Sequence, residues 1–348
     1  MRLASSGISV TGVTKALLGS PQISAALLRA GVDGLGDSRI ENIERLRCSG
    51  VRSRITLIRT PMLSQVDRIV RYTDISFNTE LDVIAALSSS AQKSAIVHNV
   101  VLMVELGDLR EGLLPCDLLK AVEITQRLPN ILFKGIGSNL ACLSGVSPDD
   151  ANMSDLSKLA DSIDAKFGPI TEIVSGGNSA NINWVISGAE TGRINNLRLG
   201  EAILFGREAL HRAPIEGLHV DAITLVAEVI EVKIKPSQPW GELAQNAFGE
   251  VAQVSDRGPS SRALVAIGRQ DIDPSGLSPP PGMMLLGTSS DHLVLDIRNQ
   301  PVSVGDTMTF QVDYGAFLRA MTSPFVGQLL SSHKAQRGDK KLAESNVI

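Results

Sequence analysis

Short apolar runs alternate with amphipathic segments over about the first 210 residues, and this alternation constrains the fold more than any other feature. The runs that resemble strands number eight, at residues 8–13, 34–36, 55–59, 75–77, 100–106, 132–137, 172–174 and 196–199. The segments between them carry apolar residues at helical spacing. Such alternation predicts parallel βαβ units, and eight of them match a (β/α)₈ barrel, expected over residues 1–213. A doubly wound open sheet is the competing fold.

The pattern changes after about residue 213. A long β-rich run lies within 217–235, and further runs follow at 262–267, 292–297 and 308–312, with turn signals between them and no helical spacer. This predicts an antiparallel all-β domain over residues 214–332. The polar stretch 333–348 is expected to be a flexible tail.

Composition narrows the function classes. The chain has 33 basic and 37 acidic residues and no basic stripe with interleaved aromatic residues, so we expect no nucleic-acid partner. No apolar stretch is long enough to span a membrane, and the start of the chain lacks a signal-peptide core. Cys48, Cys116 and Cys142 are widely spaced, which indicates a reducing cytoplasm and neither a disulfide framework nor a metal site. We interpret Cys142 as a packing residue.

Polar residues gather where the predicted strands end. In a (β/α)₈ barrel the site is built from the C-terminal strand ends and the loops after them. Lys15 follows the first strand, and a desolvated lysine there can attack a carbonyl carbon to form a Schiff base, although most lone lysines are solvated. The loops at 175–179 and 199–201 follow strands seven and eight, the usual phosphate position. An amine facing a phosphate cradle suggests pyridoxal phosphate (PLP).

Several short motifs, in their order and spacing, resemble the alanine racemase family of fold-type III PLP enzymes, and within it most closely the ornithine racemase group. They are V-T-K-A at 13–16, G-D-S-R-I-E-N at 36–42, E-L-G-D-L-R-E-G at 105–112, G-I-G-S-N-L-A-C at 135–142, S-G-G-N-S at 175–179, N-L-R-L-G-E at 196–201, A-I-G-R-Q-D-I-D at 266–273 and G-T-S-S-D-H-L-V-L-D at 287–296.

The resemblance implies roles around the cofactor ring. Lys15 would hold the cofactor and act as the base on one face of the substrate Cα. Arg198 would point at the pyridine nitrogen and, by staying protonated, disfavour a proton there. Arg110 matches the arginine near the cofactor phenolate and the substrate carboxylate. Asn139 stands where alanine racemases carry a histidine against the ring.

The resemblance also implies that Ser179 and the backbone of Gly200 and Glu201 hold the phosphate. Two departures stand out. Gly19 replaces the tyrosine that usually helps to bind the phosphate. Family members also usually have a strand and a helix before the lysine strand, whereas this chain begins 14 residues before Lys15, so we expect a shortened N-terminus.

A third departure concerns the base on the opposite face of Cα. The tyrosine that serves there in alanine racemases, contributed by the partner subunit, is absent; Asp271 and His292 are the candidates, and either is as well explained as a structural polar residue. Asp271, Asp273 and Asp291 could pair with a distal ammonium, which favours a basic amino acid such as ornithine or lysine, although turn-forming aspartates are nearly as good an interpretation.

These observations predict a PLP-dependent amino-acid racemase that works as a head-to-tail homodimer. A decarboxylase or D-amino-acid lyase of the same architecture is the first alternative, because fold does not decide the reaction. A non-enzymatic PLP-binding protein is the second alternative.

Overall fold

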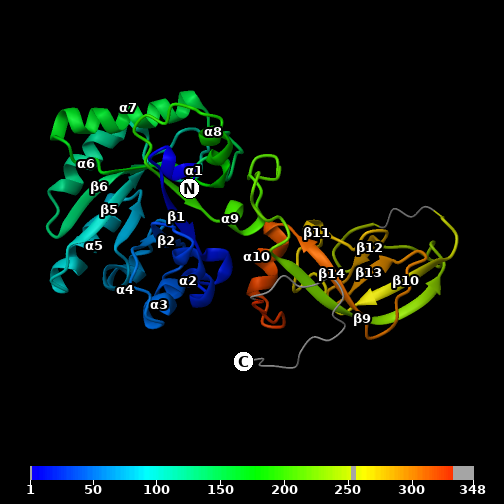
Figure 1. Ribbon diagram of the computed structural model, residues 1–348. Helices are drawn as coiled ribbons and strands as arrows, with labels where there is room; N and C mark the ends of the chain where they lie inside the picture. The colour runs from blue at the N-terminus through cyan, green and yellow to red at the C-terminus, as the bar shows by residue number, and fades with distance from the viewer. Residues whose placement is uncertain (1, 252–255, 332–348) are drawn as a thin grey trace. The chain divides into compact units, whose positions relative to one another are not determined.

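The computed structural model describes residues 2–251 and 256–331. The chain divides into two compact units, Met1–Val220 and Asp221–Ile348, which we describe one at a time (Figure 1). The tail expected over 333–348 lies outside the described residues. Within the described ranges, no helix combines the length and hydropathy needed to cross a membrane.

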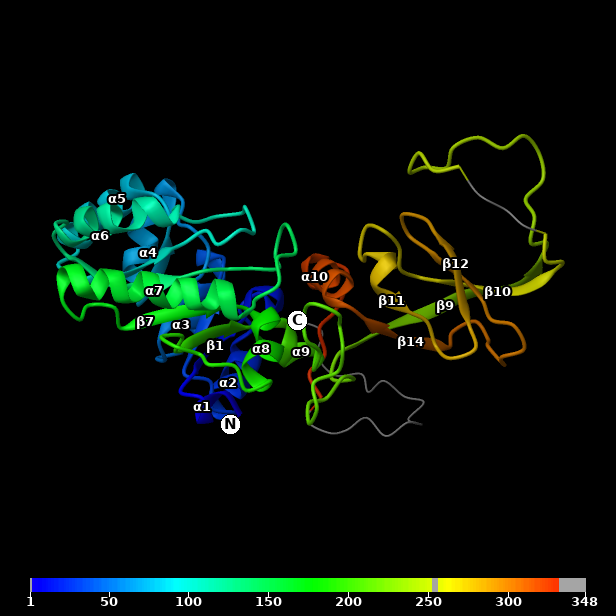
Figure 2. The ribbon, with the colours of Figure 1, turned by 90° about the horizontal axis from the view of Figure 1, so that it is seen from above.

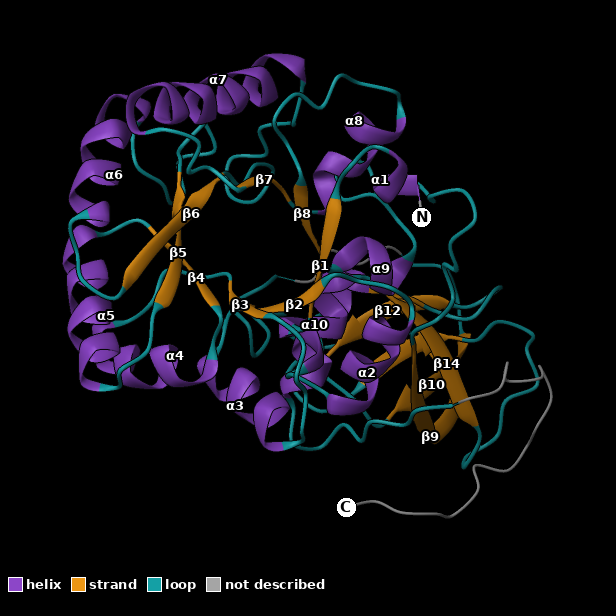
Figure 3. Ribbon diagram, turned by 60° about the vertical axis from the view of Figure 1, so that its left-hand side comes forward, coloured by secondary structure: helices purple, strands orange, loops and turns teal. Residues whose placement is uncertain are grey.

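The first unit is a closed barrel of parallel strands that pair in chain order (Figure 3). The strands are β1 (Ser9–Val13), β2 (Gly34–Asp37), β3 (Ile55–Leu57), β4 (Ile75–Asn78), β5 (His98–Met103), β6 (Ile131–Gly137), β7 (Ile173–Gly177) and β8 (Asn196–Leu199). The ring closes where β1 pairs with β8 and Thr11 lies opposite Arg198. The barrel prediction is therefore confirmed, and the open sheet is wrong.

Helices surround this barrel on its outer face (Figure 3). They are α1 (Arg2–Ser5), α2 (Pro21–Arg29), α3 (Ile40–Cys48), α4 (Val66–Tyr72), α5 (Leu81–Lys93), α6 (Leu118–Gln126), α7 (Asp150–Phe167), α8 (Ile182–Ile186) and α9 (Glu201–Phe205). Short 3₁₀ turns precede some of them: η1 (Lys15–Leu17), η2 (Leu63–Gln65), η3 (Pro115–Asp117) and η4 (Ser179–Asn181).

Strand alternation divides the apolar side chains of the barrel between two faces. Val100 and Leu102 of β5 belong to the large core shared with the helices. Val101 and Met103, which alternate with them, pack with Phe77 in a separate cluster, which we assign to the inside of the barrel. The alternating apolar side chains of β5 are thus committed to packing on both faces of the strand.

The second unit is built on an antiparallel sheet with the strand order β11-β14-β9-β10-β13-β12. The strands are β9 (Thr224–Lys235), β10 (Ser260–Val265), β11 (Leu277–Ser278), β12 (Met284–Thr288), β13 (Leu293–Asp296) and β14 (Thr307–Val312). A 3₁₀ turn, η5 (Pro274–Gly276), precedes β11.

The second unit also contains a helix, so the expectation that it is purely β needs correction. Helix α10 (Tyr314–Thr322) lies at one end of the sheet (Figure 2). The Asp313 side chain caps it by accepting a hydrogen bond from the Ala316 N–H at 2.8 Å. Ala316, Phe317 and Ala320 form its buried face. An N-cap residue followed by apolar residues at helical spacing after the last strand is the sequence signal for this helix.

Candidate active site

Lys15 lies at the C-terminal end of β1, as predicted. The residue before it is fully buried: the Thr14 N–H donates to the Gly36 carbonyl at 2.8 Å, and the Thr14 hydroxyl donates to the Asp37 carboxylate at 2.7 Å. Lys15 itself is half-buried. Its ammonium has no hydrogen-bond or ion-pair partner among residues 2–251 and 256–331. The backbone beneath the amine is therefore fixed while the amine stays available.

Asp37 holds this strand end together from β2. Its carboxylate also accepts hydrogen bonds from the Arg39 N–H at 2.9 Å and from Asn42 Nδ2 at 3.0 Å. Burial raises the pKa of the Asp37 carboxyl, and the hydrogen bond from Thr14 is the strongest opposing effect. Asp37 therefore supports Lys15 indirectly, through its hydrogen bond with the hydroxyl of the neighbouring Thr14.

The position four residues after Lys15 has no room for a side chain. Gly19 has a φ of +62°, and a Cβ built there would lie 2.8 Å from the Cβ of Asn42. Asn42 is oriented by Asp37. The tyrosine missing from the phosphate-binding motif is therefore excluded by the close approach of Asn42, on α3, to the turn that follows η1.

Arg198, on β8, is a buried cation. Its Nη1 donates to Ser175 Oγ at 2.6 Å and its Nη2 to the Ser138 carbonyl at 2.7 Å. The guanidinium also stacks on Phe77, 5.0 Å from the ring centroid. No carboxylate pairs with it in the described part of the chain. Burial lowers the pKa of Arg198 to about 10, so the group stays protonated at neutral pH and can face an electron-rich acceptor.

Asn139, at the end of β6, lies beside Arg198. Its Oδ1 accepts from Arg198 Nη2 at 3.3 Å and from Asn178 Nδ2 at 3.1 Å. Its own Nδ2 is buried and has no hydrogen-bond partner within the described ranges. An unsatisfied buried donor is costly, which makes a bound acceptor at this point favourable. Arg198 and Asn139 together therefore offer a positive charge and an unused N–H donor, which suit a planar heterocycle that carries acceptor atoms on its ring.

The loops after β7 and β8 meet at Ser179. Its hydroxyl accepts a hydrogen bond from the Ala202 N–H at 3.1 Å, so the start of η4 is tied to the start of α9. A Cβ at Gly200 would lie 3.2 Å from Val13 Cβ, which places the end of β8 against the strand that carries Lys15. The Ile203 and Leu204 N–H groups both donate to the Gly200 carbonyl at 3.1 Å, which leaves the Glu201 N–H at the start of α9 to bind an anion. Glu201 forms an ion pair with Arg212.

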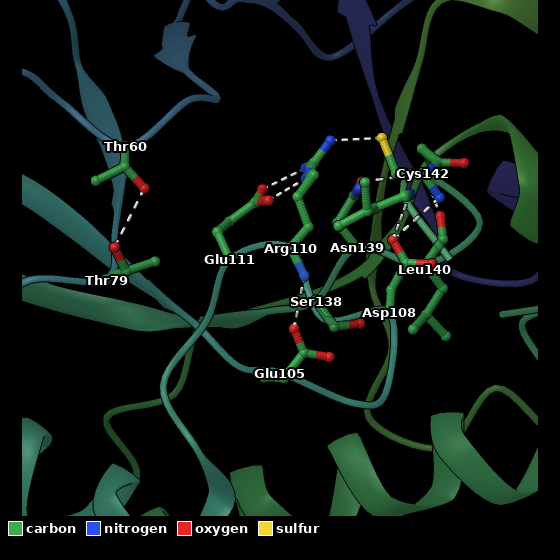
Figure 4. Close-up of polar contacts among 12 residues, drawn as sticks. Thr60, Thr79, Glu105, Asp108, Arg110, Glu111, Ser138, Asn139, Leu140 and Cys142 are labelled. Atoms are coloured by element: carbon green, nitrogen blue, oxygen red, sulfur yellow. Dashed lines mark hydrogen bonds and ion pairs between the residues drawn. The ribbon is translucent and has the colours of Figure 1, made fainter. Parts of the chain in front are cut away.

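Arg110 lies between Glu111 and Cys142 (Figure 4). Its Nε and Nη2 both donate to the Glu111 carboxylate, and its Nη1 donates to Cys142 Sγ. Burial acts against the charge, but the Glu111 ion pair outweighs it and raises the pKa of Arg110. Cys142 is exposed, so its interpretation as a packing residue is wrong.

Asp108 was missed as a site residue. Its buried carboxylate accepts four backbone N–H bonds from the loop after β6, at distances of 2.8 to 3.3 Å from Cys142, Leu143, Ser144 and Val146. Burial opposes ionisation, but these bonds outweigh it and lower the pKa of Asp108. Asp108 therefore joins the loops that carry Arg110 and Asn139. An aspartate in a turn is common, so the sequence alone held little signal for it.

Asp271 and His292 lie in the second unit. Asp271 is buried and accepts a hydrogen bond from Ser323 Oγ at 2.6 Å. His292 Nδ1 lies 3.2 Å from Ser289 Oγ in the turn between β12 and β13. The other predicted site residues, Lys15, Arg110, Asn139, Ser179, Arg198, Gly200 and Glu201, all belong to the C-terminal strand ends and loops of the barrel.

The barrel is also hollowed at its opposite end. A cavity of about 380 Å³ is lined there by residues such as Thr11, Arg54, Asp74, Lys134 and Asn196, most of them at the N-terminal ends of strands. Lys134 pairs with Glu172 at 2.6 Å across its rim. Because none of the predicted site residues lines this cavity, we place the chemistry at the C-terminal strand ends.

Several known proteins resemble this chain in sequence or in fold. The chain is 40% identical over 324 residues to ornithine racemase of Acetoanaerobium sticklandii, covering 92% of this chain and 91% of the relative. It is 37% identical over 322 residues to lysine racemase of Thermotoga maritima, covering 92% and 90%. In structure it is similar to alanine racemase of Clostridium difficile 630, with a TM-score of 0.71 at 18% identity over 94% of this chain and 90% of the other. The alanine racemase N-terminal domain matches residues 1–208, and the chain belongs to the alanine racemase family.

Proposed function

We propose that this protein is a PLP-dependent racemase that interconverts the L and D forms of a basic amino acid. The observation that carries the proposal is that two unusual groups lie side by side. Arg198 is a buried cation without a carboxylate partner in the described residues, and the neighbouring Asn139 has a buried Nδ2 without a hydrogen-bond acceptor. Both groups lie at the barrel end where Lys15 presents a free amine. The names of the ornithine and lysine racemase relatives support the reaction and the basic substrate class.

The residues present fit the cofactor. Lys15 would hold its carbonyl carbon, Arg198 and Asn139 would face the ring, and Ser179 with the backbone of Gly200 and Glu201 would bind the phosphate. When bound, PLP withdraws electrons from an attached amino acid and so acidifies the Cα–H bond. Arg110 lies on the loop after β5, where we propose that it binds the substrate carboxylate.

Proton transfer is the task of the protein's own groups. Lys15 would take the Cα proton on one face in one direction of the reaction and would supply a proton to that face in the reverse direction. Arg198 stays charged at neutral pH, so it disfavours a proton on any acceptor it faces. We propose that Asp271 or His292 of a partner subunit serves the opposite face. Asp271 would have to exchange its hydrogen bond with Ser323 to do so.

We propose a head-to-tail homodimer located in the cytoplasm. Ile234 and Trp240 of the second unit are 77% and 84% exposed, which is unusual for side chains so apolar unless a partner covers them. The three cysteines are free and exposed, which suits a reducing compartment. Sedimentation of the PLP-loaded protein tests the dimer: a monomer at assay concentration would contradict it.

The function is tested by incubating the protein with PLP and pure L-ornithine or L-lysine and separating the enantiomers by chiral chromatography. We expect D product, and we expect Lys15→Ala to lose both the activity and the visible absorbance of covalently held PLP. Lys158→Ala, which removes an exposed lysine of α7, is the matched control. Carbon dioxide or aldehyde release would favour a decarboxylase or lyase, and bound PLP without turnover would favour a carrier. A visible band that persists in Lys15→Ala would overturn the site.

A further inference from the structure

Glu111 differs from four other carboxylates at the C-terminal end of the barrel. Those others are bound by backbone N–H groups or by a partner outside the strand ends: Asp37 by the Arg39 N–H, Glu105 by the Gly107 and Arg110 N–H groups, Asp108 by four N–H groups, and Glu201 by Arg212. In the described residues, Glu111 contacts only the Arg110 guanidinium. Its side chain is 24% exposed. Its one partner is therefore a flexible side chain that another cation can replace.

The backbone beneath this pair is fixed. The Arg110 N–H donates to Glu105 Oε2 at 3.2 Å, and Asp108 ties the same loop to the loop after β6. The Arg110 and Glu111 side chains can therefore part without movement of the loop. Figure 4 shows the Arg110 side chain between Glu111 and Cys142. Glu111 also acts to raise the pKa of Arg198 against its burial, which places its charge within electrostatic range of the buried cation.

We propose that Glu111 selects the basic substrate by binding its terminal ammonium. This inference rests on the proposed function. In the free protein, Arg110 and Glu111 neutralise each other. An amino acid with a terminal ammonium carries the two complementary charges, so its carboxylate replaces Glu111 on Arg110 and its ammonium replaces Arg110 on Glu111. After this exchange every charge is paired. An amino acid with a neutral side chain would bind Arg110 through its carboxylate and leave the Glu111 carboxylate without a partner, so its binding is disfavoured.

The aspartates first considered for this role are already bound. Asp273 accepts hydrogen bonds from the Ser275 N–H and hydroxyl at 3.0 and 2.7 Å, as a turn cap does. Asp291 accepts from Gln270 Nε2 and from Ser290 Oγ. Asp271 accepts from Ser323 Oγ. All three aspartates are thus hydrogen-bonded to neutral groups of the second unit. This supports a structural role for them in turns and packing over a role in binding the substrate ammonium.

The test compares Glu111→Gln with the wild type on L-ornithine and on L-norvaline, which has the same carbon chain without the terminal ammonium. Glutamine keeps an oxygen for Arg110 but loses the charge. We expect kcat/KM for ornithine to fall about 10- to 100-fold more than kcat/KM for norvaline. Titration of the visible band with each amino acid should show the same selective loss in affinity. Glu111→Asp should restore part of the preference.

Glu123→Gln is the matched control, because Glu123 forms a comparable ion pair with Arg127 on the surface of α6. An equal loss on both amino acids in Glu111→Gln would overturn the proposal, since Glu111 would then act only through Arg110. No loss, or a selective loss in Asp291→Asn instead, would also overturn it. If the wild type racemises neither ornithine nor lysine, the proposed function itself fails, and that result is distinct from a wild type that is active but unaffected by the substitution.

Discussion

We expect His98 to make the stability of the barrel sensitive to mild acid. It begins β5, is 1% exposed, and its Nε2 lies 2.8 Å from Ser76 Oγ on β4. Ser76 Oγ accepts from Asn78 Nδ2 at 3.0 Å, so its own proton is free to be donated to a neutral His98 ring. Burial lowers the pKa of His98 to about 4. Protonation of His98 would remove the ring nitrogen that accepts from Ser76 and would bury a positive charge beside β4. The same strand carries Phe77, on which Arg198 stacks.

The cost follows from the two pKa values. In the unfolded chain His98 titrates near 6.5, so between pH 6.5 and 4 the unfolded state binds a proton that the folded state does not. Stability is therefore complete above about pH 6.5, is lost as the pH falls, and levels off below about 4. The difference of about 2.5 pKa units corresponds to about 3 kcal/mol in total, of which about 2 kcal/mol is lost between pH 7 and 5.

The assay is urea unfolding of the PLP-free protein followed by Trp184 fluorescence. Trp184 is 8% exposed in the barrel, and a Trp240→Phe background removes the other tryptophan, which is 84% exposed in the second unit. Other groups also make stability depend on pH: the raised pKa of Asp37 acts in the opposite direction, and the carboxylates with lowered pKa act mainly at lower pH. These contributions are the same in the wild type and in His98→Gln, so they cancel when the two proteins are compared. We expect the wild type to lose about 2 kcal/mol more than His98→Gln between pH 7 and 5. Parallel losses would refute the reasoning.

Three further substitutions test the site. Arg198→Lys should lower kcat for ornithine at least about tenfold with the fold retained, because one ammonium cannot make the two spread hydrogen bonds of the guanidinium; unchanged kinetics would contradict its role. Gly19→Ala should lower the free energy of unfolding by about 1–3 kcal/mol in urea titrations, because φ is +62° and the new Cβ meets Asn42. Asp108→Ala should cost about 1–3 kcal/mol and raise KM, because four partly buried N–H groups lose their acceptor. Stability equal to the wild type would contradict this.

Strand order and strand ends could be predicted because they depend on local chemistry. Strand β2, predicted over 34–36, spans Gly34–Asp37 in the structure. Its Gly36 lowers strand propensity, yet a Cβ at that position would lie 2.9 Å from Thr11 Cγ2 and 3.0 Å from Ile58 Cγ2. The glycine is required by the close approach of the neighbouring strands, so low propensity here reflects tertiary packing. The helix α10 was missed because the strand pattern before it dominated the interpretation.

The contacts that hold the site could not be predicted in the same way, because their partners are distant in sequence and are backbone groups. Asp108 binds amides 34 to 38 residues away, and backbone N–H groups carry no residue-specific signal. Arg110 and Glu111 are adjacent, and their spacing alone cannot distinguish a solvated pair from an exchangeable one. The distinction comes from Asp108 and Glu105, which fix the backbone and leave only the two side chains to move. Residue type thus indicates which groups carry charge, whereas the contacts of the loop decide which charge a substrate can displace.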